Sequence, residues 1–312
     1  MEYVKLGRTG LKVSRVCQGS NMIGGYVDEA AAIPLLNACL DEGINFIDTA
    51  NVYAGGKSEE IIGKALKNRR YESVIMSKIG GPMGGGKGPN DRGSSRKYIM
   101  QALEVSLKRL QTDYVDVFMM HYWDPVAPLE ETMRTLDEIV KQGKARYLGC
   151  SNFVAWQLCK ALWVSDKHGL ERFEAIQPQY NFVDRSIEAE MLPLCLDQGI
   201  SVTPYWVLMG GMFTGKYKAG EAPPADSRFA SRPGMSDRYF KDQNFRIAKG
   251  VEDIAAKSGR TPTEVVLGWA LGTPGITSVI VGASKIEQVK ANAKYADIKL
   301  TPDEMAACNK LN

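Results

Sequence analysis

Polar residues stand at the ends of several short apolar runs in this chain. Asp48 closes one run, Lys78 closes the next and His121 closes a third. A buried strand of a parallel sheet is expected to be apolar along its whole length, and a single polar end is often only a helix cap. The same pattern recurs on later runs, at Asn152, Gln177 and Tyr205. Six such ends favour a shared site over six separate caps.

Tyr53 follows Asp48 by five residues and could donate a proton. The ordinary tyrosine pKa of about 10 is too high for efficient donation near neutral pH. A neighbouring Lys78 ammonium is expected to lower that pKa, and Asp48 would keep the lysine charged and oriented. His121 could polarise the same substrate oxygen. This set suits carbonyl reduction by hydride transfer, in which a cofactor must supply the hydride.

The elements that would position these residues alternate between strand and helix. Strands are expected at Val13–Ser20, Ile44–Thr49, Ser73–Ile79, Tyr114–His121, Ala145–Ser151, Ala175–Tyr180, Ser201–Trp206 and Val279–Ala283. Helical spacing of apolar residues is found at Asp28–Glu42, Ser58–Lys67, Ser94–Leu110, Glu130–Gln142, Ala155–His168, Ile187–Gln198, Gln243–Ser258, Pro262–Gly272 and Lys285–Ala296. Eight strand–helix units predict an α/β fold, a closed (β/α)₈ TIM barrel that forms one domain over residues 1–312.

Two long segments and a short N-terminal one fall outside this alternation. Met1–Lys12 contains the turn residues 7–10 and predicts a β-hairpin ahead of the barrel. Gly80–Gly93 and Leu208–Asp242 are rich in glycine or proline, and both follow strands. They are therefore expected as long loops on the C-terminal face of the barrel, where active sites of this fold lie.

Composition and charge exclude several classes of function. The chain has 312 residues, is 44% hydrophobic and carries a net charge of +3, which argues against a general nucleic-acid binder. Two histidines and six cysteines without a C-x-x-C pair predict no metal site and reduced thiols. We find no signal-peptide pattern and no long apolar run, so we expect a cytoplasmic protein without a membrane partner.

Two nucleotide-binding motifs can also be set aside. Residues 81–87 match the G-x-x-x-x-G-K pattern of a phosphate-binding loop, but Gly88 takes the place of the Mg²⁺-binding hydroxyl residue. No G-x-G-x-x-G occurs, so a Rossmann domain is not expected.

Longer motifs now indicate a family. They are GINFIDTANVYAGGKSEEIIGKAL (residues 43–66), SKIG around Lys78, SLKRLQTDYVDVFMMH (106–121), GKARYLGCSNF (143–153), QPQYN (177–181), FTGKY (213–217) and IVGASKIEQVKAN (280–292). With them the chain resembles the aldo-keto reductases over its whole length, in the branch of potassium-channel β-subunits and many bacterial reductases. The resemblance implies a barrel that binds NADPH across its mouth and reduces an aldehyde or ketone to the alcohol.

The resemblance also assigns roles to single residues. It implies that Tyr53 is the general acid and that Asp48, Lys78 and His121 surround it. The residues implied to bind the cofactor are Ser151, Asn152, Gln177, Tyr205, Leu208, Gly210, Lys216, Arg228, Ser284, Gln288 and Asn292. The segment 282–285 opens a helix beside Gln288, and such a helix start suits the 2′-phosphate of NADPH better than the bare hydroxyl of NADH.

Substrate binding is less defined. Apolar and aromatic side chains near the mouth could form the pocket, namely Met22, Ile23, Tyr26, Met83, Tyr122, Trp123 and Trp206. Trp206 stands where the family usually has serine, and Ala291 where it usually has glutamate. A second function stays open, a cofactor-bound regulatory subunit of the channel type. The sequence shows no N-terminal extension of the kind that blocks a pore, so we expect the enzyme. Assembly into a homo-oligomer stays open.

Overall fold

A computed structural model of the chain describes residues 1–82, 85–225, 227–230 and 233–311. Its first element is the predicted hairpin, in which β1 (Tyr3–Lys5) pairs with β2 (Lys12–Ser14) in antiparallel fashion. The hairpin lies against the N-terminal ends of later strands, because Gly7 donates to Ser201 Oγ at 2.6 Å and Arg8 pairs with Glu174 at 2.9 Å. It therefore closes the end of the barrel opposite the predicted site.

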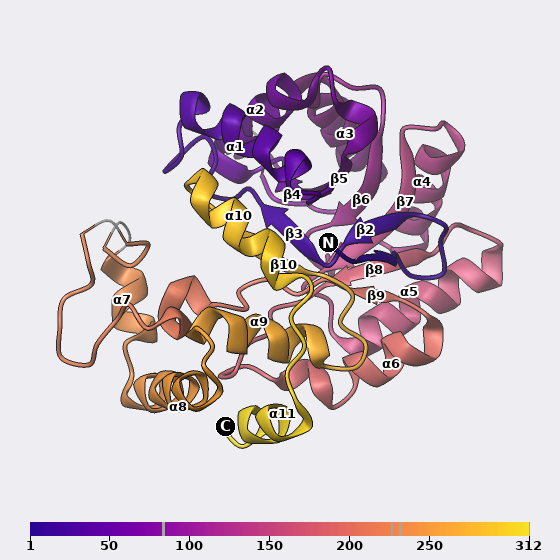
Figure 1. Ribbon diagram of the computed structural model, residues 1–312. Helices are drawn as coiled ribbons and strands as arrows, with labels where there is room; N and C mark the ends of the chain where they lie inside the picture. Colours follow the sequence, from indigo (N-terminus) through magenta and orange to yellow (C-terminus); the bar gives the residue numbers. More distant parts are fainter. Residues whose placement is uncertain (83–84, 226, 231–232, 312) are drawn as a thin grey trace.

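The described residues contain one parallel sheet of eight strands (Figure 1). In spatial order they are β10 (Val279–Gly282), β3 (Val16–Gly19), β4 (Phe46–Ala50), β5 (Val74–Ile79), β6 (Val115–Met120), β7 (Ala145–Ser151), β8 (Phe173–Gln177) and β9 (Ser201–Val202). Thr277 N donates to Val202 O, and Ile280 N donates to Pro204 O, both at 2.9 Å. These bonds join the first strand of the sheet to the last, so the sheet closes as the sequence predicts.

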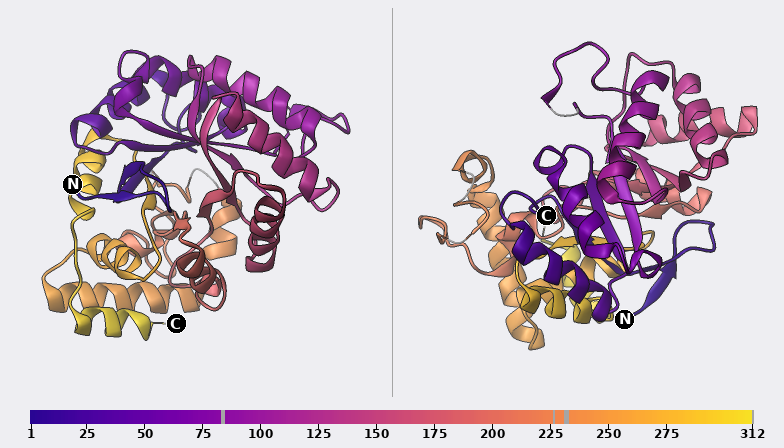
Figure 2. Two further views of the ribbon diagram at one scale, coloured as in Figure 1. Left: turned by 90° about the vertical axis from the view of Figure 1, so that its right-hand side faces the viewer. Right: turned by 90° about the horizontal axis from the view of Figure 1, so that it is seen from above.

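Helices surround the strands (Figure 2). They are α1 (Glu29–Asp41), α2 (Lys57–Leu66), α3 (Arg96–Leu110), α4 (Leu129–Lys141), α5 (Ala155–His168), α6 (Met191–Gln198), α7 (Pro233–Tyr239), α8 (Asp242–Ser258), α9 (Pro262–Gly272), α10 (Ile286–Tyr295) and α11 (Pro302–Asn309). Gly169 and Gly199 end α5 and α6 in the left-handed conformation, as expected for a glycine stop. None of the helices in the described part of the chain could cross a membrane.

The apolar core has two parts. The larger part fills the space between the sheet and the helices, and includes the fully buried Trp269 of α9. A smaller cluster lies inside the barrel, where Leu6 and Val13 of the hairpin region pack with Phe46, Met76 and other strand residues. The interior is thus filled at its N-terminal end by apolar side chains, while polar residues remain for the other end.

Three expected boundaries are wrong, two of them next to prolines. The strand expected at Ala175–Tyr180 ends at Gln177, and the one expected at Ser201–Trp206 ends at Val202. Pro178 and Pro204 lack the N–H that would extend each ladder. The helix expected at Ile187–Gln198 starts at Met191, after a single turn of 3₁₀-helix at Ser186–Glu188.

Two helices were not expected from the sequence. The mouth segment, residues 208–242, contains a 3₁₀ stretch at Met209–Thr214 and the short α7. Helix α11 follows a capping box, in which Thr301 and Glu304 bond each other's backbone N–H groups, with proline in the first turn. The capping box and the proline of α11 were readable in the sequence.

Candidate active site

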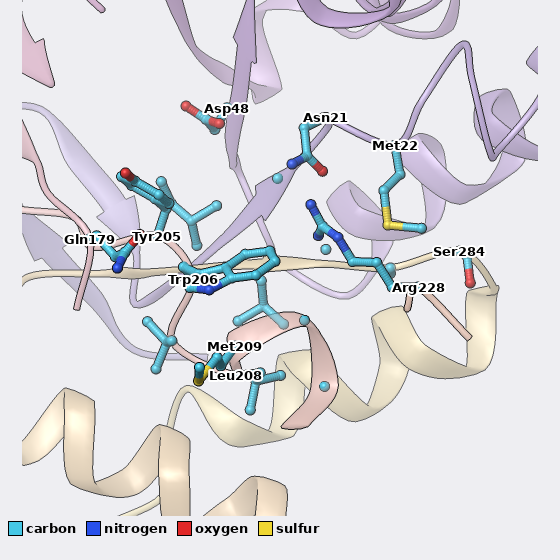
Figure 3. A pocket seen from close by; sticks show the side chains of 18 of the residues that line it. Asn21, Met22, Asp48, Gln179, Tyr205, Trp206, Leu208, Met209, Arg228 and Ser284 are labelled. Atoms are coloured by element: carbon cyan, nitrogen blue, oxygen red, sulfur yellow. The ribbon is translucent and has the colours of Figure 1, made fainter. Parts of the chain in front are cut away.

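A cavity of about 930 Å³ opens where the carboxyl ends of the strands meet. Asp48 and Ser284 lie on opposite sides of it, and Trp206 and Arg228 lie between them (Figure 3). The walls come from β3, β4, β10, the segments after β6 to β9, the mouth segment and one face of α10. The cavity thus joins the residues predicted for catalysis to those predicted for cofactor binding.

Asp48 and Lys78 form a buried ion pair at one end of the cavity. They stand on the adjacent strands β4 and β5, and the Lys78 ammonium donates to Asp48 Oδ1. The Lys78 side chain is fully buried and does not line the cavity, whereas Asp48 does. Gln177 Nε2 also donates to Asp48 Oδ1, at 2.8 Å. The lysine is therefore paired with an opposite charge beneath the cavity surface, which offsets the cost of its burial.

Tyr53 lies directly beside this pair. The Lys78 Nζ atom is 4.9 Å from the centre of the Tyr53 ring, and Tyr53 lines the cavity. Burial, followed by the Asp48 carboxylate, raises the pKa of Tyr53 well above its usual value of 10. The expectation of a lowered Tyr53 pKa is therefore wrong, because burial has the largest effect on it. A high pKa keeps the phenol protonated at neutral pH, as a proton donor requires.

His121 provides a second polar group at the same end. Its ring meets the Tyr53 ring edge-on with centroids 6.0 Å apart, and it stacks on Tyr122 at 4.4 Å. Burial, together with the nearby Lys78 charge, lowers the pKa of His121 to about 3. The imidazole is therefore neutral near pH 7 and can donate a hydrogen bond from one ring nitrogen.

Asn152, Ser151 and Tyr205 form a hydrogen-bonded group next to the catalytic end. Asn152 Nδ2 donates to His121 O at 2.9 Å and to Ser151 Oγ at 3.0 Å, and Tyr205 Oη donates to Asn152 Oδ1 at 2.8 Å. Ser151 donates onward to Gln177 O at 2.7 Å. Asn152, Gln177 and Tyr205 line the cavity, whereas Ser151 is buried behind them. Ser151 thus orients the others without reaching the cavity surface.

The mouth segment contributes the middle of the cavity wall. Leu208, Gly210, Lys216 and Arg228, which the resemblance implies for cofactor binding, all line it. The backbone turns sharply at Trp206, whose φ of 64° is unusual for a large side chain. The Arg228 guanidinium lies 4.6 Å from the centre of the Trp206 ring (Figure 3). This cation–π contact holds a positive charge at the centre of the cavity.

The far end of the cavity is formed by the start of α10. Ser284, Gln288 and Asn292 line it, and Ala291 lies between them. Gln288 Oε1 accepts hydrogen bonds from the Ser284 N–H at 2.7 Å and the Ser284 hydroxyl at 3.2 Å. One of the free N–H groups expected at this helix start is thus already capped by a side chain. The Asn292 amide nitrogen is buried and bonds to none of the described residues.

The charges and polar atoms of the cavity wall indicate the kind of ligand that it suits. The described lining residues include three cations, Lys216, Arg228 and Arg238. They include one carboxylate, Asp48, whose charge is already paired with Lys78. Buried polar atoms without a described partner are found at both ends, on His121 Nδ1 and Asn292 Nδ2. This balance favours an anionic, polar ligand. Within the described ranges, no cluster of three or more His, Cys, Asp or Glu residues could hold a metal ion.

Comparison with known proteins decides the family. The model of the Aldo/keto reductase family matches residues 15–312. The chain belongs to this family. It is thus an aldo/keto reductase family enzyme, an NAD(P)H-dependent oxidoreductase by family, and the fold and the arrangement of polar strand ends agree with the resemblance found in the sequence.

Relatives of this aldo/keto reductase carry two kinds of name. A probable voltage-gated potassium channel subunit beta of Oryza sativa subsp. japonica is 39% identical over 97% of this chain and 94% of its own length. The versiconal hemiacetal acetate reductase of Aspergillus parasiticus is 33% identical over 98% and 95%. The aldo-keto reductase YhdN of Bacillus subtilis (strain 168) is 32% identical over 99% and 93%.

The predicted substrate pocket of this aldo/keto reductase needs correction. Met22, Tyr26, Tyr122 and Trp206 line the cavity. Ile23 does not, because it pairs with Val27 in a short bridge and is fully buried in the core.

Trp123 also lies elsewhere. Its ring packs edge-on against Phe153 at 5.3 Å and Trp156 at 5.5 Å, away from the cavity. Met83 lies outside the described residues.

The sequence analysis missed several residues of the cavity wall. They include Asn21, Val52, Gln179, Met235, Arg238, Tyr239, Thr263 and Tyr295. Thr263 and Tyr295 belong to the helices α9 and α10, and only the packing of those helices brings them to the mouth. Gln179 had a readable signal, since it follows Gln177 by two residues and so points to the same side of an extended chain.

Proposed function

We propose that this aldo/keto reductase reduces an aldehyde or ketone to the alcohol with NADPH, and that Tyr53 is the general acid. The observation that carries the proposal is the Tyr53 ring, which lines the cavity 4.9 Å from the ammonium of a fully buried lysine. A protonated phenol beside a fixed cation can release its proton to an oxygen that gains negative charge, because the cation stabilises the phenolate that remains.

Each polar residue of this end has a distinct role in the proposal. NADPH would supply the hydride. Asp48 keeps Lys78 charged, and Lys78 stabilises the phenolate of Tyr53. His121, which stays neutral because its pKa is about 3, donates a hydrogen bond to the carbonyl oxygen and adds no second charge. The carbonyl carbon thereby becomes more electrophilic before the proton moves.

The cofactor would lie along the cavity. Asn152, Gln177 and Tyr205 would hold its nicotinamide end, with Ser151 supporting them from behind. Lys216 and Arg228 would bind the pyrophosphate, alongside Leu208 and Gly210. Ser284, Gln288 and Asn292 would bind the adenosine phosphate. We further propose one domain over residues 1–312, a small carbonyl substrate and a cytoplasmic location, with assembly into a homo-oligomer as an option.

An assay of NADPH consumption with an aromatic aldehyde tests the function. We expect loss of NADPH absorbance that depends on the aldehyde, and a panel of aldehydes and ketones would then define the substrate class. The names of the plant relatives favour a second candidate, a regulatory subunit that binds NADPH without turnover. Tight binding of NADPH with no consumption across the panel would support that candidate and contradict the first.

The cofactor preference gives a further prediction. We expect kcat/KM to be higher with NADPH than with NADH by roughly ten- to a hundred-fold, since one charge-assisted contact to the 2′-phosphate discriminates by about that much. Gln288→Glu should reduce or reverse the preference, because a carboxylate at the α10 end would repel the phosphate. Glu287→Gln is the matched control, since Glu287 lies on the same helix but not on the cavity wall. Equal kcat/KM values for the wild type would rule out a phosphate site here.

The mouth segment provides another prediction. If the segment closes over the cofactor, trypsin should cut after Lys218 and Arg228 more slowly when NADP⁺ is present. Lys218 is exposed and Arg228 is half-buried, while Arg232 lies outside the described residues. Digestion of an unrelated protein with and without NADP⁺ controls for inhibition of trypsin itself. Cutting at an unchanged rate would mean that the segment does not clamp the cofactor.

A further inference from the structure

The segment that carries Tyr53 has an unusual backbone. Ala54, Gly55 and Gly56 follow the tyrosine with φ values of 49°, 67° and 102°, so three consecutive residues lie in the left-handed region. Glycine adopts this conformation readily, whereas Ala54 does so at a cost and only where the surrounding structure holds it. A Cβ atom added to Gly56 would lie 2.2 Å from Cζ of Arg109. The chain therefore folds tightly around the guanidinium of this arginine.

Arg109 contacts the backbone on both sides of Tyr53. It is the second-last residue of α3, and its Nη1 donates to Asn51 O at 3.0 Å while its Nη2 reaches Gly55 O at 3.5 Å. These carbonyls stand two residues before and two residues after the tyrosine. A planar guanidinium can hold two such acceptors at once, which fixes the direction of the segment between them.

Glu59 contacts both Arg109 and the strand β5. Its side chain is fully buried in the first turn of α2, and Arg109 Nη1 donates to Glu59 Oε2 at 3.2 Å. Burial raises the pKa of Glu59, while hydrogen bonds from Ser77 and Arg109 oppose that rise. Ser77 donates to Glu59 Oε1 at 2.7 Å and directly precedes Lys78 on β5. The carboxylate thus links the arginine to the strand that holds the catalytic lysine.

The same segment is tied to that strand a second time. Asn51 N donates to Lys78 O at 2.9 Å, and Asn51 Nδ2 donates to the hydroxyl of Tyr98 at 3.0 Å. Neither Arg109 nor Glu59 lines the cavity. Their contacts therefore act on the geometry between Tyr53 and Lys78 and not on a bound ligand.

We propose that Arg109 and Glu59 are positioning residues that hold Tyr53 at its working distance from Lys78. The inference rests on the proposed function of Tyr53 as the general acid. Since a displacement of about 1 Å at a reacting group can cost up to 100-fold in rate, loss of this support lowers kcat without removing any group from the cavity.

The test compares Arg109→Met with a matched control, Arg70→Met. Arg70 also pairs with a buried carboxylate, Asp116 at 2.7 Å, and donates to two backbone carbonyls, Ser73 O at 3.0 Å and Tyr114 O at 3.1 Å. Arg70 lies at the N-terminal ends of β5 and β6, whereas Lys78 lies near the C-terminal end of β5. We expect both variants to lose thermal stability, but only Arg109→Met to lose kcat, by about tenfold or more, with the Kd for NADP⁺ within twofold of wild type.

Arg109→Lys covers the case in which Arg109→Met does not fold. It keeps a charge beside Glu59, but one ammonium cannot hold both carbonyls, so kcat should still fall. In a Tyr53→Phe background, Arg109→Met should have no further effect on kcat, because the group being positioned is gone. Unchanged kcat in the folded Arg109 variants, or an equal loss in Arg70→Met, would overturn the proposal. Full activity of Tyr53→Phe itself would instead overturn the function on which it rests.

Discussion

Replacement of Tyr53 by phenylalanine should lower kcat for carbonyl reduction by about 100-fold or more, the usual contribution of a general acid. The change removes only the hydroxyl, and the ring keeps its place beside the Lys78 ammonium. The phenol is protonated at neutral pH because burial raises its pKa well above 10. The variant therefore loses the one proton that the proposed mechanism delivers to the carbonyl oxygen.

The binding of NADP⁺ separates this result from general damage. Asn152, Gln177 and Tyr205 retain their contacts in Tyr53→Phe, so the Kd for NADP⁺, measured by calorimetry, should stay close to the wild-type value. Tyr71→Phe serves as a control, since this ring is 96% exposed and has no role in the proposed mechanism. A kcat within a few-fold of wild type in Tyr53→Phe would remove Tyr53 from the mechanism and leave His121 as the group to test.

The sequence could locate the catalytic end for a physical reason. Carboxyl ends of parallel strands converge in a closed barrel, so polar residues that interrupt apolar strands at that end must meet. Asp48, Lys78, His121 and Gln177 meet in this way. The direction of a side chain in a turn cannot be predicted in the same way, because it depends on tertiary contacts. Ile23 turns into the core through its bridge to Val27, which spacing alone did not reveal.

Electrostatic properties were harder to predict than positions. The presence of Lys78 beside Tyr53 suggested a lowered pKa, but the shift depends on how much water each group loses, and burial dominates for Tyr53. The positioning contacts of Arg109 were equally hidden. Arg109 stands in a helix 50 residues after Glu59, and only the packing of α2 against α3 brings the two side chains together.

Replacement of Lys78 by methionine should lower kcat by an amount comparable to Tyr53→Phe, about 100-fold or more. Methionine fills a similar volume, but it has no charge to stabilise the phenolate that forms when Tyr53 gives up its proton. It also leaves the Asp48 carboxylate, which is 3% exposed, without its partner. An uncompensated buried charge costs about 3–5 kcal/mol of stability, so the melting temperature should fall as well.

The double variant Asp48→Asn, Lys78→Met tells these two effects apart. Asparagine has nearly the shape of aspartate and no charge to leave unpaired, and Gln177 Nε2, 2.8 Å from the oxygen at this position, can still donate to an amide oxygen. The double variant should therefore regain most of the melting temperature that Lys78→Met loses, while its kcat stays about 100-fold below wild type. Recovery of kcat together with stability would mean that Lys78 serves only to balance Asp48, because the chemistry would then proceed without any cation beside Tyr53.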